Sequence, residues 1–168
     1  MGSAGLASGP FLAGLLFNTM AKIQTVHISY KGVAALTDLL TGQIDYLVGS
    51  QSGAFSHVKA GRLRTLGMIG RTRSKLLPEI PTISEAGLPG YEFDLWVFIA
   101  APAATPRAVI DVLHSAVTRS VAAPDVTERL LKVGSEPTSS TPEELGRRML
   151  DAARRTGQML EVAGIKPQ

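Results

Sequence analysis

The sequence has no cysteine and few aromatic residues, and both shortages narrow what the chain can be. Without cysteine it can form no disulfide framework, no thiolate zinc site and no cysteine nucleophile. Aromatic residues make up 5% of the 168 residues, whereas hydrophobic residues make up 45%. The core must therefore be built mainly from aliphatic side chains, as in layered α/β folds. Charged residues, at 18%, are too few for a disordered chain.

The sequence also lacks a long apolar run. Its most apolar stretch, residues 11–17, falls far short of the roughly 20 residues that cross a bilayer. No basic segment precedes this stretch and no convincing small-residue cleavage site follows it, as a signal peptide would require. We therefore expect a buried helix here and no export signal in the chain, which predicts a cytoplasmic location if Met1 is the true start.

The sequence has no long run of charges of one sign. The net charge is +3, and the one basic cluster has acidic neighbours on an expected helix; it consists of Arg147, Arg148, Arg154 and Arg155. We interpret this cluster as a solvated helix face and expect no nucleic-acid partner. The histidines have no mutual spacing that suits a metal, so we expect neither a metal site nor a cofactor; they are His27, His57 and His114.

Segments rich in β-branched residues alternate with helical segments in the first half of the chain. We expect strands at residues 25–30, 44–48 and 63–69, and helices at residues 10–21, 34–40 and 54–60. The connections between these segments are short. This rhythm predicts a parallel sheet that is covered by helices.

The second half is predicted to be mainly helical after one long apolar strand. That strand is expected at residues 93–101 and contains Trp96, the only tryptophan. Helices are then expected at about residues 106–121, at residues 124–132, and from Pro142 onward. Thr141 and Glu144 form a capping-box pattern around a proline at the first helical position, which is a strong start signal for the last helix.

Two glycine-containing loops that lead into helices are the candidate ligand site. They span residues 3–9 and 30–32. Such a loop presents backbone N–H groups and the positive end of the helix dipole, and in a parallel sheet it opens at the ligand-binding edge. Neutral backbone dipoles and hydroxyls suit an anion. Together with a serine after the second strand, the candidate residues are Ser3, Ala4, Gly5, Ser8, Gly9, Tyr30, Lys31, Gly32 and Ser50.

Several motifs of the chain resemble a known family of receptors. The chain is similar to the periplasmic solute-binding receptors of tripartite tricarboxylate transporters, often called Bug receptors. The matching stretches occur in order along nearly the whole chain: residues 2–5 with Ser8, 27–32, 35–45, 57–66, 77–90, 101–102 with 105–106, 136–144 and 163–165.

The resemblance implies an α/β, type II periplasmic-binding-protein-like fold with two lobes around a cleft. Residues 1–93 would be the second-lobe unit, without its first elements. Residues 94–168 would be the crossover strand and helices of an incomplete first lobe. The implied function is extracytoplasmic capture of a small mono- or dicarboxylate, partly through water, for a tripartite tricarboxylate transport system. The implied partners are that ligand and the membrane components of the transporter, and the implied location is the periplasm.

Two alternatives remain open at the level of sequence. The chain could be a degenerate, truncated fragment that binds no ligand and acts only as an assembling domain. It could also be an enzyme, for which a serine hydrolase is the candidate, because residues 49–53 superficially resemble a nucleophile elbow. Their spacing is not Gly-x-Ser-x-Gly, and no convincing acid and histidine follow in order, so we do not expect an enzyme.

The apolar residues of the second half predict self-association. The strand expected at residues 95–101 has no native sheet to join if the first-lobe strands are missing, and the helices after it lack much of their partner surface. Exposed apolar side chains forgo burial energy, and bare strand edges recruit partners. We therefore expect a homo-oligomer that forms through exchanged carboxyl-terminal helices.

Overall fold

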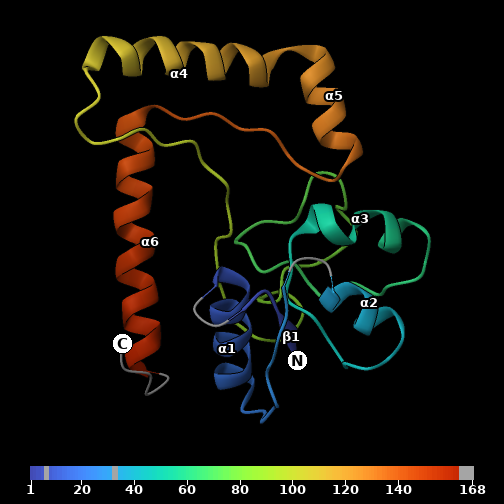
Figure 1. The fold of residues 1–168 in the computed structure, drawn as a ribbon. Coiled ribbons are helices and arrows are strands. Elements are labelled where there is room, and N and C mark those ends of the chain that lie inside the picture. Colours follow the sequence, from blue (N-terminus) through green and yellow to red (C-terminus); the bar gives the residue numbers. More distant parts are fainter. Residues whose placement is uncertain (6–7, 32–33, 163–168) are drawn as a thin grey trace.

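The computed structural model describes residues 1–5, 8–31 and 34–162 (Figure 1). It is rich in helices and contains a small parallel sheet. In chain order the elements are β1 (Gly2–Ser3), α1 (Gly9–Ala21), β2 (Ile28–Ser29), α2 (Ala34–Leu40), α3 (Gln51–Lys59), α4 (Arg107–Ala122), α5 (Pro124–Lys132) and α6 (Pro142–Val162).

The strand β1 is the centre of the small sheet. It pairs in parallel with β2, with Gly2 opposite Ile28. On its other side it forms a parallel bridge from Gly2 to Leu47, and the backbone N–H of Gly2 donates to the Tyr46 carbonyl over 3.0 Å. The parallel α/β arrangement predicted from the sequence is confirmed.

The two faces of this sheet are covered by different helices. Side chains alternate between the faces of a strand. On one face lies α1, where a Cβ placed on Gly14 would be 2.5 Å from Met1 Sδ and 3.3 Å from Val48. On the opposite face a Cβ on Gly2 would meet Ile44 at 2.5 Å and the Tyr30 ring at 3.2 Å. The absence of a side chain at Gly2 and Gly14 is therefore what allows such close packing.

Side-chain caps explain where the helices start. Ser8 accepts a hydrogen bond from the Phe11 N–H and caps α1, and Ser50 does the same for Gly53 at α3. Thr141 and Glu144 bond each other's backbone N–H groups over 3.0 and 3.1 Å, which confirms the predicted capping box at α6. The sequence predicted the starts of α1 and α6 because such caps are local, but α3 begins at Gln51, before the predicted residue 54.

The predicted strands are mostly wrong in length. Of residues 25–30 only Ile28–Ser29 form a strand, and residues 44–48 contribute a single bridge at Leu47. Residues 63–69 contribute one bridge, from Met68 to Thr82. Strand ladders need a neighbour at every step. The strand β1 offers only two residues to the first two segments, and residues 63–69 pair instead with Thr82.

The core of the first half lies between α1 and residues 91–93. Ala13, Tyr91 and Phe93 are buried together, and partly buried aliphatic and aromatic side chains surround them: Leu12, Leu16, Phe17, Met20, Val48, Ile69, Ile83 and Leu88. The Tyr91 hydroxyl donates a 2.9 Å hydrogen bond to the Ala13 carbonyl. Burial raises the pKa of Tyr91, so this hydroxyl remains a donor.

Residues 94–101 do not form the strand that the sequence predicted. The segment is extended but unpaired within the part of the chain that the structure describes, and its apolar side chains range from partly to fully exposed. Val97 is fully exposed and Ile99 is 72% exposed. The physical reason is the same as for the other strands: a β-branched, aromatic segment becomes a strand only where a neighbouring strand supplies hydrogen-bond partners.

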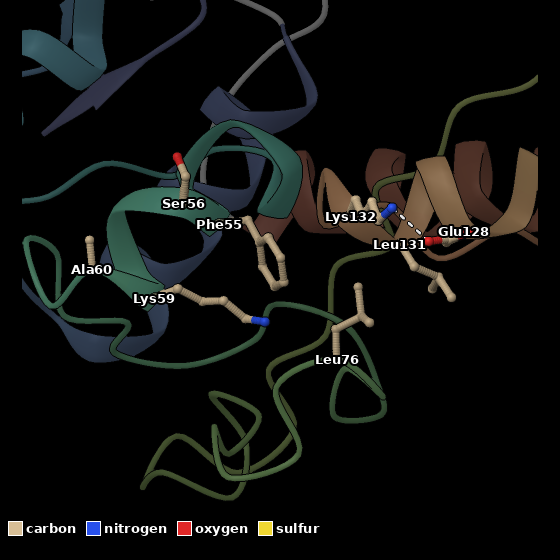
Figure 2. Close-up of a pocket in the computed structure, with 8 residues that line it drawn as sticks. All are labelled: Phe55, Ser56, Lys59, Ala60, Leu76, Glu128, Leu131 and Lys132. Carbon is tan, nitrogen blue, oxygen red and sulfur yellow. Dashed lines mark ion pairs between the residues drawn. The ribbon is translucent and has the colours of Figure 1, made fainter. Parts of the chain in front are cut away.

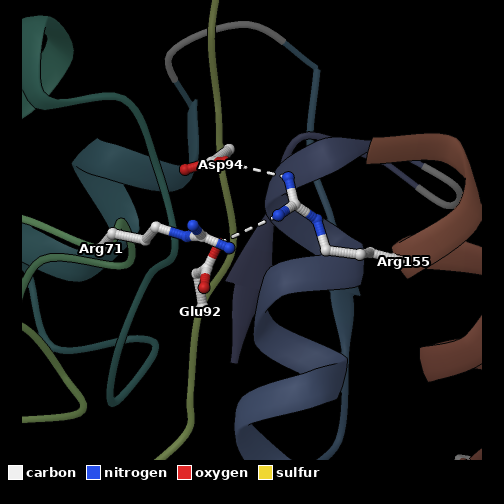
Figure 3. Close-up of polar contacts among 4 residues, drawn as sticks. All are labelled: Arg71, Glu92, Asp94 and Arg155. Atoms are coloured by element: carbon white, nitrogen blue, oxygen red, sulfur yellow. Dashed lines mark hydrogen bonds and ion pairs between the residues drawn. The ribbon is translucent and has the colours of Figure 1, made fainter. Parts of the chain in front are cut away.

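Of the last three helices, α4 lies farthest from the sheet (Figure 1). The helix α5 turns sharply from α4 back towards α3, and α6 descends on the side of α1. Arg155 of α6 lies 3.5 Å from the Glu92 carboxylate and 3.4 Å from that of Asp94, and Arg71 pairs with the same Glu92 (Figure 3). These ion pairs connect α6 to the first half of the chain.

No helix in the described ranges is both long enough and apolar enough to cross a membrane.

Candidate ligand-binding site

The carboxyl ends of three parallel segments define one edge of the sheet. The strand β1 leads through residues 4–8 into α1, β2 leads through Lys31 towards α2, and the segment around Leu47 leads through Ser50 into α3. Because the segments are parallel, their following loops open at the same edge, where α/β proteins bind ligands. Most of the candidate residues predicted from sequence lie at this edge.

The loop before α1 is shaped by Gly5 and Ser8. Gly5 has a φ of 108°, a conformation that favours glycine. The Ser8 hydroxyl donates to the Gly5 carbonyl over 2.7 Å and accepts from the Phe11 N–H over 3.3 Å. Ser8 therefore closes the loop onto the helix. Ala4 is exposed beside it, whereas residues 6 and 7 lie outside the described residues.

The first turn of α1 has fewer free backbone N–H groups for an anion than a typical helix start. Pro10 has no N–H, and the Phe11 N–H is already bonded to Ser8. Of the first three helical residues, only Gly9 has an N–H that neither the helix nor the Ser8 cap can satisfy. An anion at this helix start would therefore meet one backbone donor together with the helix dipole.

Ser3 supports the loop from within the protein. Its side chain is completely buried, and its Oγ lies 2.7 Å from Nε2 of His27. The His27 ring packs against Phe11 with ring centroids 4.7 Å apart. Burial, and to a lesser degree the charge of the amino terminus, lowers the pKa of His27. The Ser3 hydroxyl is thus directed to His27.

Tyr30 lies on the opposite face of the sheet from α1. Its hydroxyl donates to the Asp38 carboxylate of α2 over 2.8 Å. Burial, and then this hydrogen bond, raises the pKa of Tyr30. Lys31 is exposed at the end of β2, and Gly32 lies outside the described residues. The structure thus places Tyr30 with α2 and does not bring its hydroxyl together with Ser8.

Ser50 has a local structural role at the start of α3. Its Oγ accepts from the Gly53 N–H and from the Ser52 hydroxyl, each over 3.4 Å. Within the described residues, neither Ser50 nor Ser52 is bonded to a histidine. Nor do the described residues place three potential metal ligands of the His, Cys, Asp or Glu type together.

The sequence analysis missed Ser29, the last residue of β2. It is exposed, and its Oγ lies 3.6 Å from the position that a Cβ on Gly5 would occupy. The alternation of side chains along residues 27–30 was the signal that could have found it. That alternation places Ser29 on the α1 face, one residue away from Tyr30.

A separate groove lies between α3 and α5 (Figure 2). It has a volume of about 680 Å³ and is lined by Phe55, Ser56, Lys59, Ala60, Leu76, Glu128, Leu131 and Lys132. Lys59 lies over the Phe55 ring, and Lys132 pairs with Glu128. None of the candidate residues predicted from sequence lines this groove.

Comparison with known protein families shows which family the chain belongs to. The family model for the "Tripartite tricarboxylate transporter family receptor" matches residues 1–165. The chain belongs to this receptor family. Its members are receptors in transport, and the resemblance identified from the sequence motifs is confirmed.

Individual relatives agree with this membership. The chain is 38% identical over 145 residues to the UPF0065 protein in the tcbD-tcbE intergenic region of Pseudomonas sp. strain P51, covering 85% of this chain and 43% of the relative. It is 27% identical over 140 residues to Protein BugT of Bordetella pertussis, covering 83% of this chain and 43% of BugT.

Solved receptor structures match nearly the whole chain. A Rhodopseudomonas palustris protein solved with adipate has a TM-score of 0.89 and 30% identity over 99% of this chain. The periplasmic binding protein BugD has a TM-score of 0.87 and 26% identity over the full chain. MatC from Rhodopseudomonas palustris, solved with malate, has a TM-score of 0.78 and 26% identity over 96% of this chain.

The matches cover these proteins only in part. The chain accounts for 56% of the adipate-bound structure, 58% of BugD and 56% of MatC. It thus spans about half the length of these solved receptors.

Proposed function

We propose that this chain forms one wall of a periplasmic receptor site that captures a small mono- or dicarboxylate. The observation that carries the proposal is the shared edge of β1, β2 and the Leu47 segment, with the Ser8-capped start of α1 at its centre. Support comes from the solved relatives, one of which was solved with adipate and another with malate. The captured ligand would pass to the membrane components of a tripartite tricarboxylate transporter.

The chemistry of the edge suits reversible binding of an anion. The Gly9 N–H and the positive end of the α1 dipole attract a carboxylate. Lys31, exposed at the end of β2, adds a positive charge at the same edge. We propose that residues 1–93 form the unit that bears this wall, and that residues 94–168 belong to the other lobe of the receptor.

A negative charge introduced at the cap tests the site. Aspartate and asparagine both cap helices, so Ser8→Asp and Ser8→Asn preserve the start of α1. Aspartate adds a negative charge and gives up the bond to the Gly5 carbonyl, which the asparagine amide can still donate. We expect nuclear magnetic resonance titration of the 168-residue chain with adipate and malate to show weak, saturable binding. Ser8→Asp should abolish it and Ser8→Asn should retain it.

A charge added at a distant cap is the matched control. Thr141→Asp places the same charge at the start of α6 and should leave the titration unchanged. The proposal is wrong if Ser8→Asp and the unmodified chain bind adipate equally. Absence of binding in the unmodified chain would instead favour the alternative function, an assembling domain without a ligand.

We also propose that the chain associates with a second copy of itself. Its solvent-accessible surface is 11259 Å², roughly 3,300 Å² above the value expected for a compact monomer of 17.7 kDa. A stable interface of standard size needs about 800 Å² from each partner. The excess is therefore large enough for an extensive interface.

The unpaired segment supplies the surface for this association. Residues 94–101 expose both backbone and apolar side chains, and α4 exposes Val109, Val112 and Leu113. Two such segments can pair about a two-fold axis while carboxyl-terminal helices are exchanged, since each copy offers the same surface to the other. Light scattering after size exclusion tests this: a clean monomer of 17.7 kDa, with protected amides in α6, contradicts it.

A further inference from the structure

We propose that Ser29 is a specificity-determining residue of the carboxylate site, where its hydroxyl donates a hydrogen bond to the carboxylate bound beside Gly5. This inference rests on the proposed function, because it assigns a further group to the same edge. It concerns a residue that lies within the matching stretch 27–32 but outside the candidate residues predicted from sequence.

The register of the sheet places Ser29 on the α1 side. Ser29 lies opposite Ser3 in the parallel ladder, so their side chains leave the sheet on the same face. His27, two residues earlier, also lies on this face and packs against Phe11 of α1. The Ser29 side chain therefore lies on the face that bears the amino-terminal end of α1.

The Ser29 hydroxyl lies directly beside the loop before α1. Its Oγ is 3.6 Å from the position that a Cβ would occupy on Gly5. Gly5, with its φ of 108°, has no side chain to separate this hydroxyl from a ligand. A small anion that approaches the Gly5 backbone would therefore meet the Ser29 hydroxyl.

Of the three serines on the α1 face beside Gly5, Ser29 is the one whose proton is available, whereas Ser50 lies at the start of α3. The Ser8 hydroxyl donates its proton to the Gly5 carbonyl, and the Ser3 hydroxyl is buried against His27. Ser29 is exposed, and its hydroxyl has no hydrogen-bond partner among residues 1–5, 8–31 and 34–162. Because a carboxylate only accepts hydrogen bonds, a serine with an uncommitted proton is the one suited to bind it.

The Ser29 hydroxyl adds a hydrogen-bond donor where the start of α1 has few free backbone N–H groups. Pro10 has no N–H and that of Phe11 is capped, so among the first three helical residues only the Gly9 N–H lacks a partner within the described residues. One backbone donor would then face two carboxylate oxygens. A second donor from β2 allows each oxygen to accept one bond. Bonds of this kind to a charged acceptor are shorter and stronger than neutral ones.

Two substitutions at Ser29 separate a hydroxyl effect from a loss of structure. Ser29→Ala removes the donor, whereas Ser29→Thr keeps it and suits a strand. The affinity of the 168-residue chain for adipate is measured by nuclear magnetic resonance titration, with the neutral diamide adipamide as a probe that lacks the charge. We expect Ser29→Ala to weaken adipate binding by about fivefold, and Ser29→Thr to restore it.

Matched measurements make the outcome decisive. Ser120→Ala removes an exposed serine of α4 and should leave the adipate affinity unchanged. Adipamide binding should respond less to Ser29→Ala than adipate binding does. Equal adipate affinity in Ser29→Ala and the unmodified chain overturns this inference alone. If neither adipate nor malate shifts the resonances of the unmodified chain, the proposed function fails and this inference fails with it.

Discussion

The hydroxyl of Tyr91 donates a hydrogen bond to the carbonyl of Ala13 across 2.9 Å, within the buried core. The two residues are far apart in the sequence, and the bond fixes α1 against the segment that leads out of the first half of the chain. This segment bears Glu92, Phe93 and Asp94, and through them the packing of α1 is connected to that of α6.

Removing this hydroxyl is expected to destabilise the protein. Tyr91→Phe keeps the ring in the core but removes one buried hydrogen bond, so we expect unfolding free energy to fall by about 1 kcal/mol. Urea denaturation followed by circular dichroism measures the change. Tyr30→Phe is the control, because it removes a half-buried hydroxyl from the other face of the sheet and should cost less. Equal losses for both substitutions would contradict the argument from burial.

Because the pKa of Tyr91 is raised, we also expect the protein to lose stability at alkaline pH. Burial raises its pKa in the folded state above the unfolded value of about 10. Below pH 10 both states hold the proton, so the contribution is fully present. Above pH 10 the unfolded state releases the proton while the folded state keeps it, and stability falls as the pH rises. Urea midpoints between pH 8 and 11 should fall more steeply in the unmodified chain than in Tyr91→Phe.

Two glycines with similar backbone angles are expected to differ in tolerance to alanine. Gly134 has a φ of 77° and Gly61 a φ of 67°, both unfavourable for alanine. A Cβ on Gly134 would lie 2.7 Å from Phe55, whereas one on Gly61 meets nothing within 4 Å.

We therefore expect Gly61→Ala to cost about 1 kcal/mol from the backbone alone. Gly134→Ala should cost about 1–3 kcal/mol more because of the steric overlap with Phe55. Thermal melts of the two variants provide the comparison. Similar melting temperatures would show that the segment after α5, which contains Gly134, moves away from Phe55 at little cost.

Arg155 is expected to position α6 without adding much global stability. Its side chain is 42% exposed and pairs with Glu92 and Asp94 at 3.5 and 3.4 Å (Figure 3). Partly exposed pairs contribute little and are screened by salt. Arg155→Met should therefore speed hydrogen exchange in α6 while changing the unfolding free energy by less than about 1 kcal/mol.

Arg154→Met is the matched control for this prediction. Arg154 pairs only with Asp151 of its own helix within the described residues, at 3.9 Å. Its substitution should leave exchange in α6 near that of the unmodified chain. If both substitutions speed exchange equally, the contacts to Glu92 and Asp94 do not hold the helix.

Charges on the unpaired segment are expected to prevent self-association. Val97 is fully exposed and Ile99 is 72% exposed, on the segment proposed to meet a second copy. Val97→Lys with Ile99→Lys should give a monomer in light scattering, because two like-charged segments repel each other and lysine disfavours edge pairing. Val26→Lys is the control, since Val26 is 80% exposed but lies outside this segment. Association that survives the double substitution would exclude residues 97 and 99 from the interface.

The sequence by itself determined where most helices lie and in which order helices and strands follow one another along the chain. The start of α6 follows from Thr141, Pro142 and Glu144, and the start of α1 from Ser8 and Pro10. These signals are sufficient because a helix satisfies its hydrogen bonds within a few residues of itself. The receptor fold, by contrast, was expected from the resemblance of motifs along the chain to a known family.

Only the tertiary structure decided the lengths of the strands and the surroundings of the site residues. Residues 44–48 and 93–101 have the composition of strands, but a strand is completed by a neighbour that can lie anywhere in the sequence. The pairing of Ser3 with His27, of Tyr30 with Asp38, and the exposure of Ser29 beside Gly5 all depend on the register of β1 and β2. A shift of one residue in that register would exchange the two faces of the sheet, and no local pattern in so short a ladder fixes it.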